Sequence, residues 1–369
     1  MRAVILSHAY VTSPPRGKLR ALAGLGCSVA VAVPDRWVDP RGGTVASADW
    51  DDDGGVRVVP VPVRGDAGRA DLARWDRRAL QRLLRDFRPD LLQIEEEPRS
   101  YVAAMATAQD RRLHIPSVIL TMSSPARPAT IGERLRRRRV LRTVAGVVAG
   151  NHLAERLVVE VQPDIARSVI PQIGVALPAA ASDPGGPLAI GFFGRLVPEK
   201  GLDLLLRACV RLLGDWTLEV VGSGPAQVEL EALAERLGIA ARVTWHGALP
   251  ARELSEVWEG LRCVVMPSRT TRDWIETSGQ PAVLAMAHGL PAVVTRTGAL
   301  PATVEEGGLI VPEDDVPALA AALQRLVDDP AGRAEIGAAG RRRAMAFFSN
   351  EALARRQLEF WRGLLRASD

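Results

Sequence analysis

Lysine is nearly absent from this chain of 369 residues: Lys18 and Lys200 are the only two, and the other 45 of its 47 basic residues are arginine. Aromatic residues make up only 4% of the chain, which argues against the stacking platforms that bind single-stranded nucleic acids. No apolar run reaches the ~20 residues that a membrane-spanning helix needs. The three cysteines, Cys27, Cys209 and Cys263, lack metal-ligand spacing, so we expect neither a zinc site nor a disulfide framework.

The same features indicate where the protein works. An odd number of cysteines suits a reducing cytosol, and the first residues, Met1–Ser7, are apolar too briefly for a signal peptide. The acidic run Asp51–Asp53 precedes two glycines in a polar stretch, and we expect it to bind no metal. Hydrophobic residues at 47% and charged residues at 24% are typical of globular proteins. The bias towards arginine, alanine and glycine is typical of bacteria with GC-rich genomes. We therefore expect a soluble, cytoplasmic bacterial protein.

Arginine occurs in runs, although the formal net charge is only +4. The runs are Arg134–Arg139, which one leucine interrupts, and Arg341–Arg343. Two interpretations stay open: solvated faces of helices, or attraction of an anionic membrane or ligand. The second includes weak peripheral membrane contact through Arg134–Arg139. We expect no binding of nucleic acid, because neither interleaved aromatic residues nor a nucleic-acid-binding motif accompanies the charge.

Short β-branched apolar runs alternate with amphipathic helical patterns along the first half of the chain. The predicted strands are Val4–Ser7, Ser28–Val33, Val56–Val61, Leu91–Ile94, Ser117–Leu120 and Val144–Ala149. The predicted helices are Lys18–Leu25, Ala70–Phe87, Tyr101–Gln109 and Ile131–Thr143. Such alternation is typical of a parallel sheet with both faces covered by helices.

The pattern begins again after Ala179–Pro187, a stretch rich in proline and glycine that is typical of a linker. The predicted strands here are Ala189–Gly194, Thr217–Val221, Val243–His246, Cys263–Met266, Ala292–Thr295 and Gly308–Val311. The predicted helices are Leu202–Leu213, Pro225–Leu237, Ala251–Glu259, Pro281–His288 and Val316–Val327, followed by a last helix over Asn350–Leu365. We predict an α/β protein of two doubly wound, Rossmann-like domains that face each other across a cleft. The domains are 1–175, with the helix in 350–369 packing back on it, and 176–349.

Three strand-to-helix loops of the second half carry residues suited to a nucleotide. After Gly194, Arg195 and Lys200 place two cations beside the start of a helix, which suits a diphosphate and a departing phosphate. Gly222–Gly224 form a second turn, where glycines let the backbone approach a ligand, although a tight turn without a ligand explains them as well. Glu276 precedes a helix, where its carboxylate can accept two sugar hydroxyls or simply complement the helix dipole.

Taken together, these segments resemble the group 1, or family 4, glycosyltransferases. That family is retaining, uses nucleotide sugars and has the two-domain GT-B fold. The resemblance covers Phe192–Val327 well and is fainter in the first half. Its most specific part is Pro267–Thr271 followed by Asp273, Trp274 and Glu276.

The resemblance implies roles for the matched residues. Arg195 and Lys200 bind the donor diphosphate and stabilise the leaving nucleotide, while Glu276, the first glutamate of a Glu–seven residues–Glu motif, holds hydroxyls of the transferred sugar. Together with His8, these are the expected catalytic residues. The expected contacts to the nucleotide sugar are Gly194, Gly222, Ser223, Gly224, Gly247, Ala248, Ser278, Gly279 and Leu284. The resemblance implies no metal and no cofactor besides the donor substrate.

Two residues of the family pattern are missing. Leu284 stands where the second glutamate should be, and leucine cannot accept the hydroxyls of the ribose. Losing a charge-assisted contact of ~1.5–3 kcal/mol would weaken donor binding about tenfold to 150-fold. The histidine that many members carry after the strand ending at Leu120 is also absent, and Thr121–Ser124 follow instead.

Polar residues at strand ends in the first half are the expected acceptor contacts. His8 and Tyr10 follow the first strand, and Lys18 begins the first helix. Glu95, Glu96 and Glu97 follow a later strand, where they bind an acceptor group or cap a helix N-terminus. His8 contacts the donor phosphates or the acceptor in one interpretation and is structural in the other.

The sequence thus predicts a glycosyltransferase that moves a sugar from a nucleotide-diphosphate sugar to a small-molecule or lipid-linked acceptor. The resemblance implies retention of anomeric configuration. Two alternatives stay open. Leu284 and the missing histidine favour a catalytically weak partner protein that binds nucleotide sugars, and Glu95–Glu97 could serve a sugar-nucleotide epimerase of the same fold.

Overall fold

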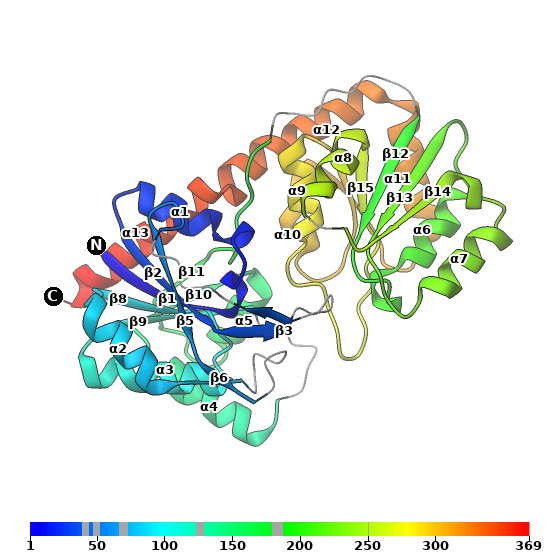
Figure 1. Cartoon of the computed structure of the whole chain (residues 1–369). Coiled ribbons are helices and arrows are strands. Elements are labelled where there is room, and N and C mark those ends of the chain that lie inside the picture. Colours follow the sequence, from blue (N-terminus) through cyan, green and yellow to red (C-terminus); the bar gives the residue numbers. More distant parts are fainter. Residues whose placement is uncertain are drawn as a thin grey trace. The chain divides into compact units, whose positions relative to one another are not determined.

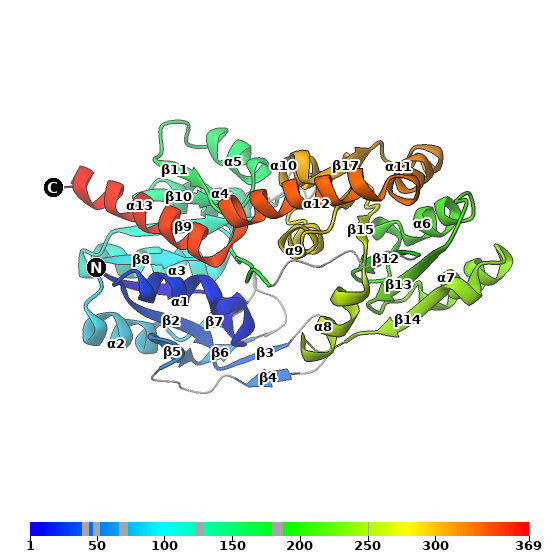
Figure 2. The same ribbon diagram turned by 90° about the horizontal axis from the view of Figure 1, so that it is seen from above.

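The structure is a computed structural model that describes residues 1–38, 44–46, 52–65, 73–122, 129–178, 187–249 and 251–368. The chain divides into two compact units, Met1–Gly174 with Ser349–Asp369, and Val175–Phe348. Each unit contains one large parallel sheet with helices packed on it (Figures 1 and 2). The predicted α/β class is therefore confirmed. Most of the predicted linker, 179–186, lies outside the described residues.

The N-terminal unit is built on seven parallel strands in the order β11-β10-β9-β8-β1-β2-β5. They are β1 (Arg2–Leu6), β2 (Ser28–Pro34), β5 (Val56–Val61), β8 (Leu91–Ile94), β9 (Ser117–Thr121), β10 (Gly146–Ala149) and β11 (Arg167–Val169). Two short antiparallel pairs accompany the sheet, β3 (Arg36–Val38) with β4 (Thr44–Ala46) and β6 (Val63–Arg64) with β7 (Arg74–Trp75). The helices are α1 (Gly17–Gly24), α2 (Arg77–Phe87), α3 (Tyr101–Leu113), α4 (Ile131–Leu141), α5 (His152–Val159) and α13 (Asn350–Ser368), with 3-10 turns η1 (His8–Tyr10) and η2 (Pro14–Arg16).

All six strands predicted for this unit are present. Five are apolar runs buried along almost their whole length, whereas β5, at the edge of the sheet, is buried only in part. The helix predicted from Ala70 begins later. Asp76 caps it with a carboxylate that accepts the Ala79 N–H at 2.8 Å, and Arg74–Trp75 before it pair as a strand. Sequence periodicity missed β11 and α5, since both are short.

The C-terminal unit has six parallel strands in the order β14-β13-β12-β15-β16-β17. They are β12 (Leu188–Phe193), β13 (Trp216–Val221), β14 (Val243–Gly247), β15 (Cys263–Met266), β16 (Ala292–Thr295) and β17 (Gly308–Val311). The α-helices are α6 (Leu202–Cys209), α7 (Gln227–Arg236), α8 (Ala251–Gly260), α9 (Gln280–His288), α10 (Leu300–Val304), α11 (Val316–Asp328) and α12 (Pro330–Arg343). The short turns are η3 (Pro198–Lys200), η4 (Ala240–Arg242), η5 (Glu305–Gly307) and η6 (Ala344–Phe348).

The strands of this sheet bury alternate residues in two different clusters. Along β15, Cys263 and Val265 belong to one cluster, and Val264 and Met266 to the other. Because successive side chains of a strand point to opposite faces, the sheet has an apolar core on each face. All three cysteines of the chain are free and buried, as the composition predicted. In the described residues, none of the helices is both long and apolar enough to cross a bilayer.

Helix α12 was missed because its sequence, rich in glycine and arginine, lacks an apolar stripe. Its glycines serve close packing. A Cβ on Gly337 would lie 2.0 Å from the Gly289 carbonyl oxygen, and one on Gly340 would lie 2.9 Å from the Met286 side chain. Glycine weakens a helix in isolation, but here it lets α12 lie directly against the end of α9.

Helix α13 belongs to the N-terminal unit and is anchored by Trp361 (Figure 1). The indole is completely buried, and its Nε1–H donates to Gln93 Oε1 at 2.8 Å. Gly146 leaves space for this helix, because a Cβ there would lie 2.8 Å from Leu364.

We expect Trp361→Ala to destabilise the N-terminal unit by about 3–5 kcal/mol, since it empties a large buried site and leaves Gln93 without its donor. Urea unfolding of the full chain measures the loss of stability, and hydrogen exchange resolved by peptide shows which unit has lost it. Phe347→Ala removes a half-exposed aromatic residue of the other unit and should change stability by no more than about 0.5 kcal/mol. Equal losses in both units would contradict the assignment of α13.

Candidate active site

The predicted donor residues lie on loops at one edge of the C-terminal sheet. All six strands are parallel, so their carboxyl ends share that edge. The loops follow neighbouring strands: β13 and β15 flank β12, and β14 and β16 lie beside them. Residues separated by up to 85 positions in the sequence, from Gly194 to Gly279, are thereby gathered in one place.

Three glycines join the loops after β12, β13 and β14. Gly222 has a φ of +142°, and a Cβ on it would lie 1.8 Å from the Gly194 carbonyl oxygen. Its N–H donates to the Gly247 carbonyl at 2.8 Å, and the Gly194 N–H donates to Val221 at 3.0 Å. These two amides are occupied, so neither is free to donate to a ligand, and contact of the glycines with a nucleotide sugar stays a prediction. The glycines set how closely the loops pack.

The next residues continue this packing. The Ser223 carbonyl accepts the Leu196 N–H at 2.9 Å, and a Cβ on Gly224 would lie 2.3 Å from the Leu196 carbonyl oxygen. Gly247 adopts a left-handed φ of +67°, and Ala248 after it is exposed. The loop bearing Arg195 is thus held against the β13 turn by backbone contacts.

Lys200 and Glu276, two of the predicted catalytic residues, form an ion pair. Lys200 Nζ lies 2.6 Å from Glu276 Oε2 and 4.8 Å from the centroid of the Trp274 ring. The Glu276 carboxylate is buried, and it also accepts a hydrogen bond from Ser268 Oγ at 3.3 Å. A buried carboxylate requires such partners, and Lys200 supplies the balancing charge.

Two close backbone contacts fix this pair. A Cβ on Gly201, whose φ is +69°, would lie 2.0 Å from the Pro267 carbonyl oxygen, which ties the lysine loop to the loop after β15. The Glu276 carbonyl accepts the Ala299 N–H at 2.9 Å, and a Cβ on Gly298 would lie 1.9 Å from that carbonyl oxygen.

Three polar groups in the loops that carry the pair have no hydrogen-bond partner among the described residues. Arg195 is exposed, and its guanidinium has no hydrogen-bond or ion-pair partner in the part of the chain that the structure describes. The N–H groups of Ser278 and Gly279, just before α9, likewise bond to no acceptor among the described residues. Two cations and a helix N-terminus make an environment suited to an anion. Leu284, in contrast, is half-buried and packs on the apolar cluster beneath α9.

In the N-terminal unit, the three consecutive glutamates all bind residues of this chain. Glu95 lies 3.4 Å from Lys18 Nζ, and Glu96 binds His8. Glu97 accepts hydrogen bonds from Thr121 Oγ1 at 2.9 Å and from a backbone amide at 2.7 Å. Ser100, not a glutamate, caps α3, so the capping interpretation is wrong. Glu95 and Glu97 are engaged within the unit, and acceptor binding by one of the three stays a prediction.

The prediction that Tyr10 and Lys18 contact the acceptor also needs correction. Both are completely buried, so neither presents a side chain to an acceptor. Burial, together with the charge of Glu95, raises the pKa of Tyr10 well above its usual value, and its hydroxyl donates to the Gln172 carbonyl at 3.1 Å. Glu95 also accepts hydrogen bonds from Gln93 at 2.6 Å and Gln172 at 3.2 Å. These residues form the polar interior of the unit.

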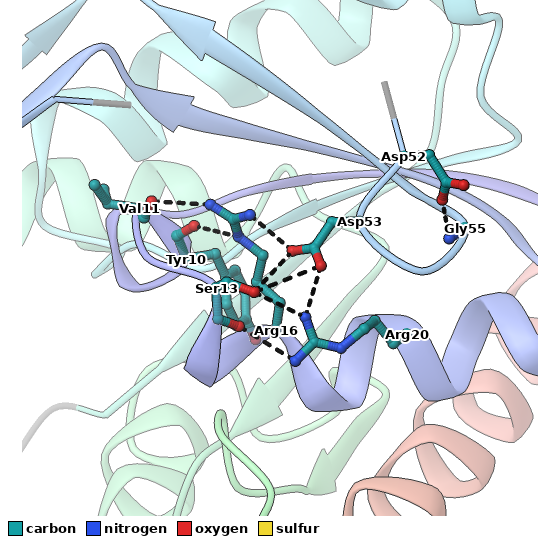
Figure 3. A network of polar contacts seen from close by, with 8 residues as sticks. All are labelled: Tyr10, Val11, Ser13, Arg16, Arg20, Asp52, Asp53 and Gly55. Atoms are coloured by element: carbon teal, nitrogen blue, oxygen red, sulfur yellow. Dashed lines mark hydrogen bonds and ion pairs between the residues drawn. The ribbon is translucent and has the colours of Figure 1, made fainter. Parts of the chain in front are cut away.

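A second polar cluster, which sequence reasoning missed, holds the loop after β1 (Figure 3). Arg16 donates to Asp53 at 2.7 Å and to the carbonyls of Tyr10 and Val11, and Arg20 donates to the other Asp53 oxygen at 2.8 Å. Burial would raise the pKa of Asp53, but the two arginines outweigh it and lower that pKa. Asp51 lies outside the described residues.

His8 stands at the exposed edge of this loop. Its Nδ1 lies 2.7 Å from Glu96 Oε1, and its ring stacks on Trp37 at a centroid distance of 4.6 Å. Burial lowers the pKa of His8, but the Glu96 carboxylate, with smaller contributions from Glu95 and Glu97, outweighs it, so the pKa lies above 6.5. Neither Glu96 nor Trp37 could be assigned to His8 from the sequence, where they lie 88 and 29 positions away.

Comparison with known proteins agrees with these features. The model of the glycosyl transferases group 1 matches residues 187–329, and that of a glycosyl transferase 4-like domain matches residues 16–173. The fold resembles sucrose-phosphate synthase from Thermosynechococcus elongatus (TM-score 0.75, 21% identity, all of both chains). It also resembles Anabaena Alr3699/HepE in complex with UDP (TM-score 0.76, 17% identity, 98% of this chain and all of that one). Glycosyltransferase models thus match successive parts of both units, and the fold is that of the GT-B glycosyltransferases. The predicted GT-B fold is confirmed.

Curated relatives match over part of their length. The GDP-mannose-dependent alpha-(1-6)-phosphatidylinositol monomannoside mannosyltransferase of Mycolicibacterium smegmatis is 37% identical over 41% of this chain and 41% of its own. The 2-deoxystreptamine glucosyltransferase of Streptomyces kanamyceticus is 31% identical over 51% of this chain and 50% of its own. The D-inositol 3-phosphate glycosyltransferase of Kineococcus radiotolerans is 30% identical over 60% of this chain and 58% of its own. The matched region thus spans about half of these relatives.

We expect Lys18→Met to destabilise the N-terminal unit by about 3–5 kcal/mol, because it leaves Glu95 charged and buried without a cation. Urea unfolding at pH 7 measures the loss. The double variant Lys18→Met/Glu95→Gln removes both charges and should recover most of it. If the double variant is as unstable as the single one, the loss comes from packing and not from the unpaired charge.

Proposed function

We propose that the protein transfers a sugar from a nucleotide-diphosphate sugar to a hydroxyl group of its acceptor. The observation that carries this proposal is the Lys200–Glu276 ion pair, which joins the loop bearing Arg195 to the loop before α9. These residues lie in the unit that the group 1 glycosyltransferase model matches. We further propose that configuration is retained and that no metal takes part, on the resemblance of Pro267–Glu276 to the retaining family.

In the proposed reaction, Arg195 and Lys200 bind the donor diphosphate. Lys200 then exchanges part of its contact with Glu276 for the phosphate oxygens, and Glu276 becomes able to accept hydroxyls of the sugar. As the bond between the anomeric carbon and the phosphate oxygen breaks, negative charge grows on the leaving group, and both cations stabilise it. The free amides of Ser278 and Gly279 add two donors for the same charge.

For the acceptor, we propose a molecule that bears a cyclitol ring, either small or lipid-linked. The three relatives support this class: their names specify phosphatidylinositol monomannoside, 2-deoxystreptamine and D-inositol 3-phosphate. Of the two alternatives, the weak partner protein is favoured by Leu284 and predicts donor binding without transfer. An epimerase is disfavoured, since the carboxylates of Glu95 and Glu97 are engaged within the unit.

We expect Arg195→Ala to weaken binding of the donor nucleotide about tenfold to 150-fold, the loss of one charge-assisted contact. Calorimetric titration with GDP, UDP, GDP-mannose and UDP-glucose measures this affinity. A parallel transfer assay uses D-inositol 3-phosphate and 2-deoxystreptamine as acceptors, and repeating it with EDTA tests whether a metal takes part. Arg207→Ala, which removes an exposed arginine of α6, is the matched control and should bind like the wild type.

Glu276→Gln should lower the rate of transfer without weakening binding of the free nucleotide, because the carboxylate holds the sugar and its loss leaves Lys200 free for the phosphates. Wild-type protein that binds none of the four nucleotides would contradict the proposed function. Binding without transfer to any acceptor would favour the partner protein.

We also propose that α4 contacts an anionic membrane surface. Ile131 and Leu135 are 77% and 64% exposed and lie one helical turn apart. Arg134, Arg138 and Arg139 are exposed around them, whereas Arg136 turns inward, donating to the Arg99 carbonyl at 2.7 Å and lying over the Tyr101 ring. Two exposed apolar residues ringed by arginines suit the interface of a bilayer with acidic headgroups.

Sedimentation with vesicles of phosphatidylcholine and 30 mol% phosphatidylglycerol tests this proposal. We expect wild-type binding to fall with rising salt, and Ile131→Ser/Leu135→Ser to reduce it at least about tenfold, since each apolar side chain contributes ~1.5 kcal/mol or more. Val228→Ser, which changes a residue of α7 that is equally exposed, is the control. Equal binding by both variants would contradict the contact through α4.

A further inference from the structure

Trp274 differs from other large aromatic residues of the C-terminal unit in what it packs against. It is half-buried, yet it belongs to neither of the two apolar clusters that the described residues form on the faces of the sheet. Phe193 and Trp258, in contrast, pack in one of these clusters. A buried indole normally stabilises a protein through contacts with other apolar side chains. The position of Trp274 therefore calls for another partner.

That partner is the ammonium group of Lys200. Its Nζ lies 4.8 Å from the centroid of the Trp274 ring and 2.6 Å from Glu276 Oε2. An ammonium has three hydrogens to donate, and the carboxylate accepts one of them. The face of the ring attracts the charge, and the Lys200 side chain is 21% exposed. The ammonium is thus held by two partners and keeps a donor for an acceptor outside the chain.

The loop that bears Trp274 is fastened to the loop that bears Lys200. The Arg269 N–H donates to the Glu199 carbonyl at 2.9 Å, and the Arg269 guanidinium pairs with Asp203 of α6 at 3.1 Å. Glu199 directly precedes Lys200, and Asp203 follows it by three positions. These contacts on either side of the lysine set the position of the ring over the ammonium.

The two partners of Lys200 act differently on an anion that binds there. The Glu276 carboxylate carries a negative charge, which competes with a phosphate for the ammonium and repels the phosphate. The Trp274 ring has no net charge, and its quadrupole attracts a cation without that repulsion. A lysine held by the ring can therefore stay in place while it gives up part of its contact with Glu276.

We propose that Trp274 is a positioning residue of the donor site, an inference that rests on the proposed function. Its ring holds the Lys200 ammonium where the donor diphosphate binds, so that Glu276 can turn to hydroxyls of the sugar. Trp274 acts on the diphosphate through Lys200 and needs no contact with the donor. All the residues involved belong to the C-terminal unit.

The scarcity of lysine allows a direct test by NMR. In full-length protein labelled with carbon-13 lysine, the only two residues that give signals are Lys18 and Lys200. We expect the ring current of Trp274 to shift the ε-methylene signal of Lys200 upfield, and Trp274→Leu to abolish that shift. The Lys18 signal, from a buried residue of the other unit, should not move and is the internal control.

The same spectra recorded with saturating GDP or UDP test the role. The upfield shift of Lys200 should persist in the complex, because the ring keeps the ammonium while the phosphate approaches. A shift that is missing in the free protein, or that disappears with the nucleotide, overturns the inference and leaves the proposed function standing. If the wild type binds no nucleotide, both fail, even where the shift of the free protein is as expected.

Calorimetric titration with GDP and UDP measures the effect on affinity. Trp274→Leu should weaken binding about twofold to 30-fold, the range of a cation–π contact, and Trp274→Phe should restore part of the loss. In a Lys200→Met background, where Arg195 still binds the diphosphate, Trp274→Leu should weaken binding no further. An equal loss in both backgrounds means that the ring acts on the loop and not through the ammonium, and it overturns the inference.

Discussion

Each unit of this protein depends on one lysine that neutralises one buried glutamate. Lys18 pairs with Glu95 inside the N-terminal unit, and Lys200 pairs with Glu276 at the loop edge of the C-terminal unit. A carboxylate in either place would cost several kcal/mol without its cation. In a chain with 45 arginines, lysine was kept at these two positions, where a compact ammonium on a flexible stem reaches a single carboxylate.

The two pairs differ in what surrounds them, and this difference distinguishes a structural pair from one proposed to contact a ligand. Glu95 is also bound by Gln93 and Gln172, and no part of the pair reaches the surface, so its role is to hold strand, helix and loop together. Lys200 is partly exposed and shares its loop with Arg195, whose guanidinium has no partner among the described residues. A pair that can open towards a ligand, beside free donors, is where binding energy can be used.

Much of the fold could be predicted because a strand buried on both faces must be an apolar run, and such runs alternating with helices have few solutions other than a parallel sheet. Helix α12 could not, since the reason for Gly337 and Gly340 is the surface of α9 against which they pack. The residues proposed to bind the donor, Arg195, Lys200 and Glu276, could be picked out because they stand in short, characteristic segments. Tyr10 and the three glutamates were misread, because position at a strand end does not say which way a side chain points.

The sequence by itself determined the fold class and the alternation of strands and helices, and it predicted the residues proposed for a phosphate and sugar site. Only the tertiary structure decided which polar residues are free to act. A buried charge must find its partner wherever the fold brings one, and the partners lie far away in the sequence: Glu95 is 77 positions from Lys18, and Glu96 is 88 positions from His8. Burial and pairing are properties of the folded chain, and they alone separate a structural glutamate from one that pairs with a histidine.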